Sequence, residues 1–195
     1  MNRTADIERE TKETHIRVSL KLDGKGQAEI SSGIPFFDHM LTLFTVHGVF
    51  DLFLHAKGDL DVDFHHTVED TGLVLGKAVS KALGERKGIR RYGHAMTPMD
   101  DALAAVTVDL SNRPFLVYNA PEPAASETGI SPSLAKEFFR ALVNQAGMNL
   151  HINVPYGENE HHVIESIFKS FGRALDEASS FDERIAGVRS SKGIL

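Results

Sequence analysis

The chain contains no cysteine among its 195 residues. Disulfide bonds and thiolate metal sites are therefore excluded, and any metal ion must be bound by His, Asp or Glu. This disfavours the structural zinc sites that depend on cysteine. The sequence also lacks an apolar run approaching the roughly 20 residues that a membrane-spanning helix needs, so no membrane partner is expected.

The sequence has no excess of positive charge. Its formal net charge is −6 and it shows no basic stripe, which argues against a nucleic-acid partner. The N-terminal segment MNRTADIERETKET has no apolar stretch after its first charges, so it does not have the pattern of a signal peptide. We therefore expect a cytoplasmic protein.

The composition and the residue periodicity indicate a globular protein built from a repeated unit. Hydrophobic residues make up 42% and charged residues 25%, which is typical of a soluble domain. The periodicity predicts the element order ββαβα twice. In the first half we expect strands at 14–22, 27–31 and 50–56, the first two as a hairpin, and helices at 35–48 and 65–85. In the second half we expect strands at 100–110, 114–120 and 148–154, helices at 131–147 and 159–178, a linker at 86–98 and a polar tail at 179–195.

The repetition extends to single residues. The pattern His-His-x-x-Glu occurs at 65–69 and again at 161–165, and each copy follows a histidine by ten residues, His55 or His151. Two like units can pack about a pseudo-twofold axis, where equivalent residues meet. We therefore expect a first repeat at 1–92 and a second at 93–195, the latter with the C-terminal tail, in one structural unit with a shared core.

The repeated motif predicts two metal ions. On a helix, His65 and Glu69 lie on one face, whereas adjacent histidines point about 100° apart and cannot easily share an ion. A mixed set of imidazole and carboxylate ligands suits Mn, Fe, Ni or Zn. One ion could take His65, Glu69 and His162, and the other His161, Glu165 and His66.

Two questions stay open on the residues alone. The motif could instead mark a recurrent helix start, with Asp63 and Asn159 as caps and both glutamates in solvent. In the preceding helices, His39 and Glu137 occupy similar places and could add ligands, although Glu137 could equally be a solvated helix residue.

Several separate motifs together resemble the imidazoleglycerol-phosphate dehydratase family, from about residue 3 to the C-terminus. They are FFDHML, HHTVEDTG, KALGERKGIRRYG, VDLSNRPFLVYN, NLHI, HHVIESIFKSFGRAL and SSKGIL. The resemblance implies an α+β fold, a tandem duplication in which each half is a small sheet with two helices on one face. It also implies dehydration of imidazole-glycerol phosphate to imidazole-acetol phosphate in histidine biosynthesis. Two manganese ions per site and particles of 24 subunits, with sites at subunit contacts, are further implications.

The resemblance assigns roles to particular residues. It implies that one ion is held by His39, His65, Glu69 and His162, and the other by His66, His161, Glu165 and Glu137. Many relatives have His where this chain has Glu137. Glu13, in the family-like pattern RETKET, is expected to be the general base, with Glu69 or Glu165 as alternatives. The substrate would contact Glu13 and the ligand histidines, and its phosphate Arg91, Arg113, Ser190 and Lys192.

The expected chemistry explains why two metal ions would be needed. The proton lost in this dehydration is not next to a carbonyl group, so the electrons must come from the imidazole ring. Two metal ions on the ring nitrogens would favour the imidazolate, which can expel the adjacent hydroxyl before a base removes the neighbouring C–H proton. Two other hypotheses are a different dimetal enzyme, such as a metallohydrolase, and a structural assembly held together by metal.

Overall fold

The computed structural model describes residues 3–122 and 128–195. Its first repeat contains β1 (Thr4–Glu10), β2 (Thr14–Lys21), β3 (Ala28–Ser31), α1 (Pro35–His47), β4 (Asp51–Gly58) and α2 (His65–Leu83). Its second contains β5 (Tyr92–Met99), β6 (Ala102–Asp109), β7 (Phe115–Asn119), α3 (Pro132–Ala146), β8 (Asn149–Tyr156) and α4 (Glu160–Ser179). The predicted α+β class and its duplication are confirmed.

Within the described residues the strands form two four-stranded sheets of the same topology. Their strand orders are β1-β2-β4-β3 and β5-β6-β8-β7. The predicted hairpin between segments 14–22 and 27–31 is wrong, because β4 lies between them and β3 pairs parallel to β4. The helix α1 connects β3 to β4, and parallel neighbours require a crossover connection of this kind.

Each sheet begins with an edge strand that the periodicity did not reveal. The predicted linker 86–98 contains most of β5, and β1 lies in the N-terminal segment for which no strand was expected. Among the described residues, each of these strands pairs on one side only, β1 with β2 and β5 with β6. Edge strands tolerate charged residues and proline, and these occupy much of β1 and position 98 of β5.

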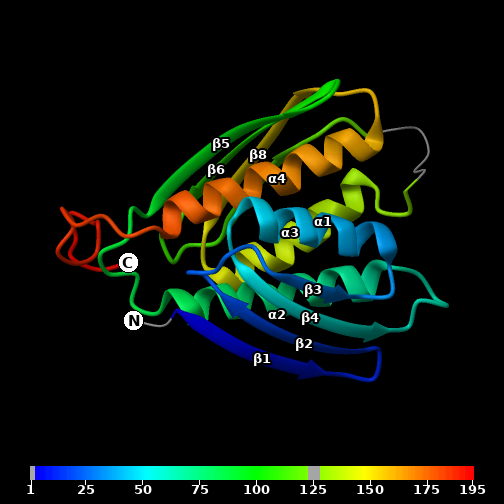
Figure 1. Ribbon diagram of the computed structural model, residues 1–195, viewed down its shortest axis with the longest axis horizontal. Coiled ribbons are helices and arrows are strands. Elements are labelled where there is room, and N and C mark those ends of the chain that lie inside the picture. Colours follow the sequence, from blue (N-terminus) through cyan, green and yellow to red (C-terminus); the bar gives the residue numbers. More distant parts are fainter. Residues whose placement is uncertain (1–2, 123–127) are drawn as a thin grey trace.

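The helices lie between the two sheets, which form the outer layers (Figure 1). The helices pair across the repeats, since α1 packs on α4 and α2 packs on α3. Phe138 of α3 joins both halves of the core, because its ring centroid lies 5.4 Å from that of Phe37 in α1 and 5.5 Å from that of Phe168 in α4. Each such buried aromatic side chain stabilises the fold by roughly 1.5–3 kcal/mol.

Two equivalent glycines allow these helix pairs to approach closely. A Cβ atom at Gly76 of α2 would lie 2.4 Å from the carbonyl oxygen of Leu142 in α3. A Cβ atom at Gly172 of α4 would lie 2.5 Å from the carbonyl oxygen of Phe44 in α1. A larger residue at either position would push the helices apart, so these glycines allow the close packing of α2 on α3 and of α1 on α4.

This arrangement brings the starts of α1, α2 and α4 to one end of the molecule, and both termini lie toward the other end (Figure 1). The repeated His-His-x-x-Glu motifs stand at the starts of α2 and α4. Within residues 3–122 and 128–195, no helix combines the length and the apolar character that crossing a membrane requires.

Candidate metal centre

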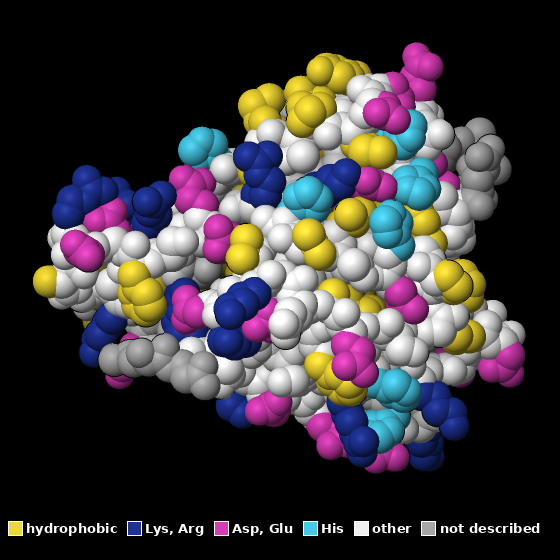
Figure 2. Space-filling model, in the orientation of Figure 1, with side chains coloured by type: hydrophobic (Ala, Val, Ile, Leu, Met, Phe, Trp, Pro, Cys, Tyr) yellow, Lys and Arg dark blue, Asp and Glu magenta, His cyan; other side chains and the backbone are white. Residues whose placement is uncertain are grey.

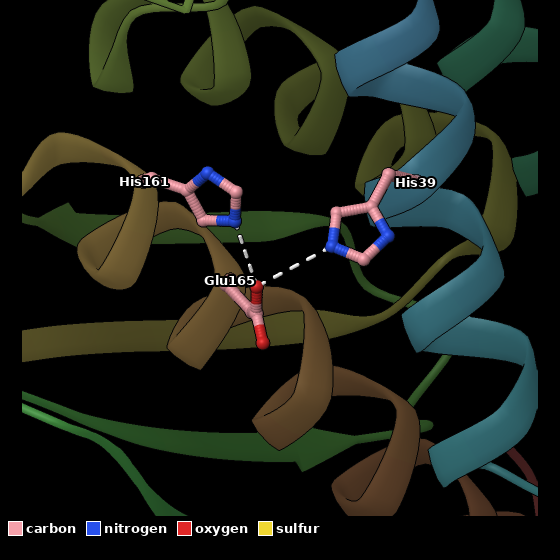
Figure 3. Close-up of side chains that lie close together, drawn as sticks. All are labelled: His39, His161 and Glu165. Carbon is pink, nitrogen blue, oxygen red and sulfur yellow. Dashed lines mark hydrogen bonds and ion pairs between the residues drawn. The ribbon is translucent and has the colours of Figure 1, made fainter.

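Three of the predicted ligands meet where α1 packs on α4 (Figure 3). Within helix α4, the Nε2 atom of His161 lies 2.9 Å from Oε2 of Glu165. Across from it, the Nε2 atom of His39 in α1 lies 3.4 Å from the same oxygen. In the described part of the chain, this is the one group of three or more potential ligand residues whose ligand atoms all lie within 4.8 Å of one another.

Local structure explains the position of this cluster. The side chain of Asn159 caps α4 by accepting a hydrogen bond from the backbone N–H of His162, at 3.2 Å. The cap fixes the first turn, from which His161 and Glu165 project four residues apart. Figure 2 shows histidine side chains gathered over α1 and the beginning of α4, while Lys and Arg side chains are spread over this face, with a group of them at the opposite end.

Lys169 is a residue of this centre that the sequence analysis missed. Its Nζ atom lies 2.5 Å from Oε1 of Glu165, whose side chain is only 7% exposed. Burial raises the pKa of Glu165, but the hydrogen bonds from Lys169 and His161 outweigh it, so that the pKa lies below its ordinary value. Glu165 is thus held as a carboxylate. The sequence did contain one signal of this contact. A lysine stands four residues after the glutamate of the second motif, and the first motif has none at that place.

The histidine and glutamate of the first motif, His65 and Glu69, are more exposed to solvent and, in the part of the chain that the structure describes, lack a third potential ligand. The Nε2 atom of His65 lies 3.3 Å from Oε2 of Glu69, and both side chains are more than 40% exposed. Among the described residues, no third potential ligand joins this pair within the same range. Leu73 occupies the position equivalent to Lys169, so Glu69 has no corresponding lysine.

The structure places His39 differently from the expected grouping with His65 and Glu69. In this chain His39 lies against Glu165, because α1 packs on α4 rather than on α2. Glu137 lies on α3, the helix that packs on α2. Its carboxylate accepts hydrogen bonds from Nη1 of Arg140, at 2.9 Å to Oε1 and 2.6 Å to Oε2.

The remaining motif histidines are each held by an aspartate. Nδ1 of His66 lies 3.0 Å from Asp59, and Nδ1 of His162 lies 2.5 Å from Asp101. The hydrogen bond with Asp59 is the main reason that the pKa of His66 is raised. A carboxylate on one ring nitrogen orients the imidazole. The other nitrogen of His162, Nε2, lies 3.5 Å from Oδ2 of Asp100. Neither ring joins a three-ligand group within the described chain.

Glu13 lies in the turn between β1 and β2 and is exposed. Its negative charge contributes to the raised pKa of His66, after the larger effect of Asp59. The expected base therefore stands near the beginning of α2, at the same end of the molecule as the histidine motifs.

The four residues expected to bind phosphate line one pocket of about 430 Å³, together with Tyr92, Ser111 and the C-terminal residues. They are Arg91, Arg113, Ser190 and Lys192. The two arginines differ in their contacts. Arg91 donates to Asp109 at 2.7 Å and to the carbonyl oxygen of Arg189 at 2.6 Å, so it anchors the tail. Arg113 is exposed to the pocket.

The pocket lined by Arg91 and Arg113 lies far from the cluster of His39, His161 and Glu165 in one chain. The backbone N–H of Arg91 donates to the carbonyl oxygen of Ala178, near the end of α4. Glu165 lies 13 residues earlier on the same helix, from 165 to 178, which corresponds to about 20 Å at a rise of about 1.5 Å per residue. The pocket and the cluster therefore belong to opposite ends of α4.

Comparisons with known proteins agree on one family. The family model described as "Imidazoleglycerol-phosphate dehydratase" matches residues 32–175. A protein of that name from Desulfosudis oleivorans is 63% identical over all of both chains. A crystal structure of IGPD from Pyrococcus furiosus superposes with a TM-score of 0.85 at 40% identity, covering 97% of this chain and 100% of that one. A crystal structure of imidazoleglycerol-phosphate dehydratase from Staphylococcus aureus superposes with a TM-score of 0.82 at 37% identity. The match covers 92% of this chain and 99% of that one. The chain therefore belongs to the imidazoleglycerol-phosphate dehydratase family.

Proposed function

We propose that this protein, a hydro-lyase of histidine biosynthesis by its family, acts with two manganese ions per site in the cytoplasm and converts imidazole-glycerol phosphate to imidazole-acetol phosphate. The observation that carries the metal proposal is the convergence of His39, His161 and Glu165, which come from two different helices and from both repeats.

The ligand atoms fit a divalent ion. Adjacent ligands of an octahedral ion with bonds of about 2.1 Å stand about 3 Å apart. The separations of the two histidine nitrogens from Oε2 of Glu165, 2.9 and 3.4 Å, are close to this value. Imidazole nitrogens with a carboxylate suit manganese. His39, His161 and Glu165 would hold one ion, and His65 and Glu69, with Glu137 as a further candidate, the other. His66 and His162 would complete the two sets.

The two ions would supply positive charge that acidifies the imidazole ring of the substrate. Glu13 then accepts the proton from the carbon next to the one that loses its hydroxyl. The proton and the hydroxyl leave overall as water, and the resulting enol becomes the ketone. Lys169 keeps Glu165 ionised through its hydrogen bond to Oε1.

At the other end of the substrate, Arg113, Ser190 and Lys192 would bind the phosphate. The guanidinium of Arg113 can make two parallel hydrogen bonds to it, and the ammonium of Lys192 adds a point charge. Arg91 lines the same pocket and holds the tail through Asp109 and the carbonyl oxygen of Arg189.

We further propose that complete sites form between copies of the chain, in a symmetric homo-oligomer of 24 subunits. The separation of about 20 Å between the metal cluster and the phosphate pocket supports this, because one substrate must contact both. The second sheet and its surroundings also expose the large apolar residues Met96, Phe115 and Tyr156. Side chains of this kind are enriched at subunit interfaces.

Metal removal tests the proposal directly. Chelated protein is expected to form no ketone product, and reloading with Mn²⁺ is expected to restore turnover together with two ions per chain. Metal content and particle mass are measured on the same samples, so that loss of metal is distinguished from loss of assembly. Absence of turnover in the assembled protein with two Mn²⁺ per chain, or full turnover after chelation, would contradict the proposal.

Glu137→Ala tests the least regular member of the proposed ligand set. If Glu137 binds the ion of His65 and Glu69, the variant is expected to bind that ion at least about 10- to 100-fold more weakly, which is the loss that removal of a mere partner of a ligand causes, while the other ion is retained. Titration of the metal-free protein with Mn²⁺ measures this. Arg140→Ala is the matched control, since it frees Glu137 from its ion pair without removing the carboxylate. Two ions of unchanged affinity in Glu137→Ala would exclude it as a ligand.

A further inference from the structure

We infer that Asp70 is a positioning residue for Glu13, and that it acts through a clamp made with Arg9, Thr11 and Thr14. This inference deepens the proposed function, because it rests on Glu13 as the general base. It gives a role to Arg9, Thr11 and Thr14 of the segment RETKET, which the reaction itself does not use.

Asp70 connects the helix of the first motif to the turn that carries Glu13. It directly follows Glu69 in α2 and is only 8% exposed. Its Oδ2 atom accepts hydrogen bonds from the hydroxyl of Thr14 and from the Nη1 atom of Arg9. Hydrogen bonds to an ionised group are about twice as strong as neutral ones. One buried carboxylate thereby fixes the strands on both sides of the turn.

Thr11 fixes the turn from within. Its hydroxyl oxygen accepts hydrogen bonds from the backbone N–H groups of Glu13 at 3.1 Å and of Thr14 at 3.0 Å. Its own backbone N–H donates to the carbonyl oxygen of Thr14 at 2.8 Å. The backbone of Glu13 is therefore held on both sides, by Thr11 before it and by the bond from Thr14 to Asp70 after it.

The carboxylate of Glu13 is left free by this arrangement. It makes no hydrogen bond or ion pair with another residue in the described ranges, and it faces solvent near His66. A base must be free to accept a proton and yet must be held at a defined distance from its target. The clamp meets both conditions, since it holds the backbone and leaves the side chain unpaired.

The second repeat has an acid at the equivalent turn but no such clamp. Asp101 directly precedes β6 as Glu13 precedes β2, and it is bound to Nδ1 of His162 at 2.5 Å. Ser166 occupies the helix position equivalent to Asp70, and its hydroxyl donates to the carbonyl oxygen of Val163 in its own helix at 2.8 Å. The clamp therefore belongs to the first repeat, the one that carries the base, and it breaks the pseudo-symmetry there.

Thr14→Val and Asp70→Asn test the inference in the Mn²⁺-loaded, assembled protein. Both variants are expected to lower kcat about 10- to 100-fold with KM and metal content unchanged, because displacement of a catalytic group by about 1 Å costs rate at this scale. Thr14→Ser, which keeps the hydroxyl, is expected to stay within about threefold of the unmodified protein. Ser166→Ala, at the equivalent position of the other repeat, is the matched control and is expected to leave kcat unchanged.

Three results would overturn the inference. They are a kcat within twofold of the unmodified protein in both variants, an equal loss in Thr14→Ser and Thr14→Val, and a loss of rate that follows a loss of bound metal. The role of Glu13 is checked separately with Glu13→Gln. If that variant is inactive while Thr14→Val and Asp70→Asn are fully active, the clamp is refuted and the base assignment stands. If Glu13→Gln is fully active, the base assignment fails, and the clamp as a device for Glu13 fails with it.

Discussion

Glu13→Gln is expected to lower kcat by about a factor of 10³ while it leaves two metal ions per chain and the assembled particle unchanged. General base catalysis contributes about 10²- to 10⁴-fold, and the amide of glutamine cannot accept the proton. The substitution preserves the shape of the side chain. The exposed Glu13 carboxylate is not part of the cluster of His39, His161 and Glu165, so metal binding is not expected to change.

The measurement combines steady-state kinetics with metal analysis of the same preparation. Glu10→Gln is the matched control, since Glu10 is an exposed carboxylate at the end of β1, three residues before Glu13. It is expected to keep normal turnover. If Glu13→Gln turns over substrate at the normal rate, the base must be sought among the ligand carboxylates, with Glu69 before Glu165. Glu69 is the more exposed of the two, and in the described part of the chain no lysine forms an ion pair with it.

The helices were largely predictable from the sequence, and the strand pairing was not. The helices at 35–48, 65–85, 131–147 and 159–178 agree with α1 to α4 to within two residues at each end. Their apolar residues recur with a helical period because one face of each helix packs in the core. Strand order has no such local signal. The parallel pairing of β3 with β4 depends on the path of α1 between them, which lies outside either strand.

The candidate site also had a part that was predictable from local sequence and a part that depended on the packing of distant segments. The repeated His-His-x-x-Glu motif predicted which histidine and glutamate side chains lie together, because spacing along a single helix determines which side chains share a face. It did not indicate that His39 would lie beside Glu165, because that contact depends on the crossing of α1 over α4 at Gly172. Lys169 was missed for a related reason: its importance follows from the burial of Glu165, which the motif does not encode.

Mixed assemblies of two inactive variants are expected to recover activity. Glu13→Gln removes the proposed base, and Arg113→Met removes a cation of the phosphate pocket. In one chain these residues stand at opposite ends. Arg3 donates to the carbonyl oxygen of Ser179, so β1 begins beside the end of α4, near the pocket. The seven residues of β1 then lead about 20 Å away, at about 3.3 Å per residue, toward Glu13.

If each site takes its base from one copy and its phosphate pocket from another, an equal random mixture leaves about one quarter of the sites with both native residues. Co-expression of the two variants is therefore expected to give about one quarter of the kcat/KM of the unmodified protein, where each variant alone gives almost none. If both residues came from the same copy, no native site could form and the mixture would be inactive.

A second mixture distinguishes a site shared between two copies from a site within one copy by the reverse design, in which one chain carries both substitutions. A chain with both substitutions, co-assembled with an equal amount of the unmodified chain, would give about one half of normal activity if a site belonged to one copy, and about one quarter if it were shared. Equal recovery in the two mixtures is thus expected, whereas zero in the first and one half in the second would contradict a shared site. Both chains of each mixture keep His39, His161 and Glu165, so the comparison depends only on whether the Glu13 and the Arg113 of one site come from one copy or from two.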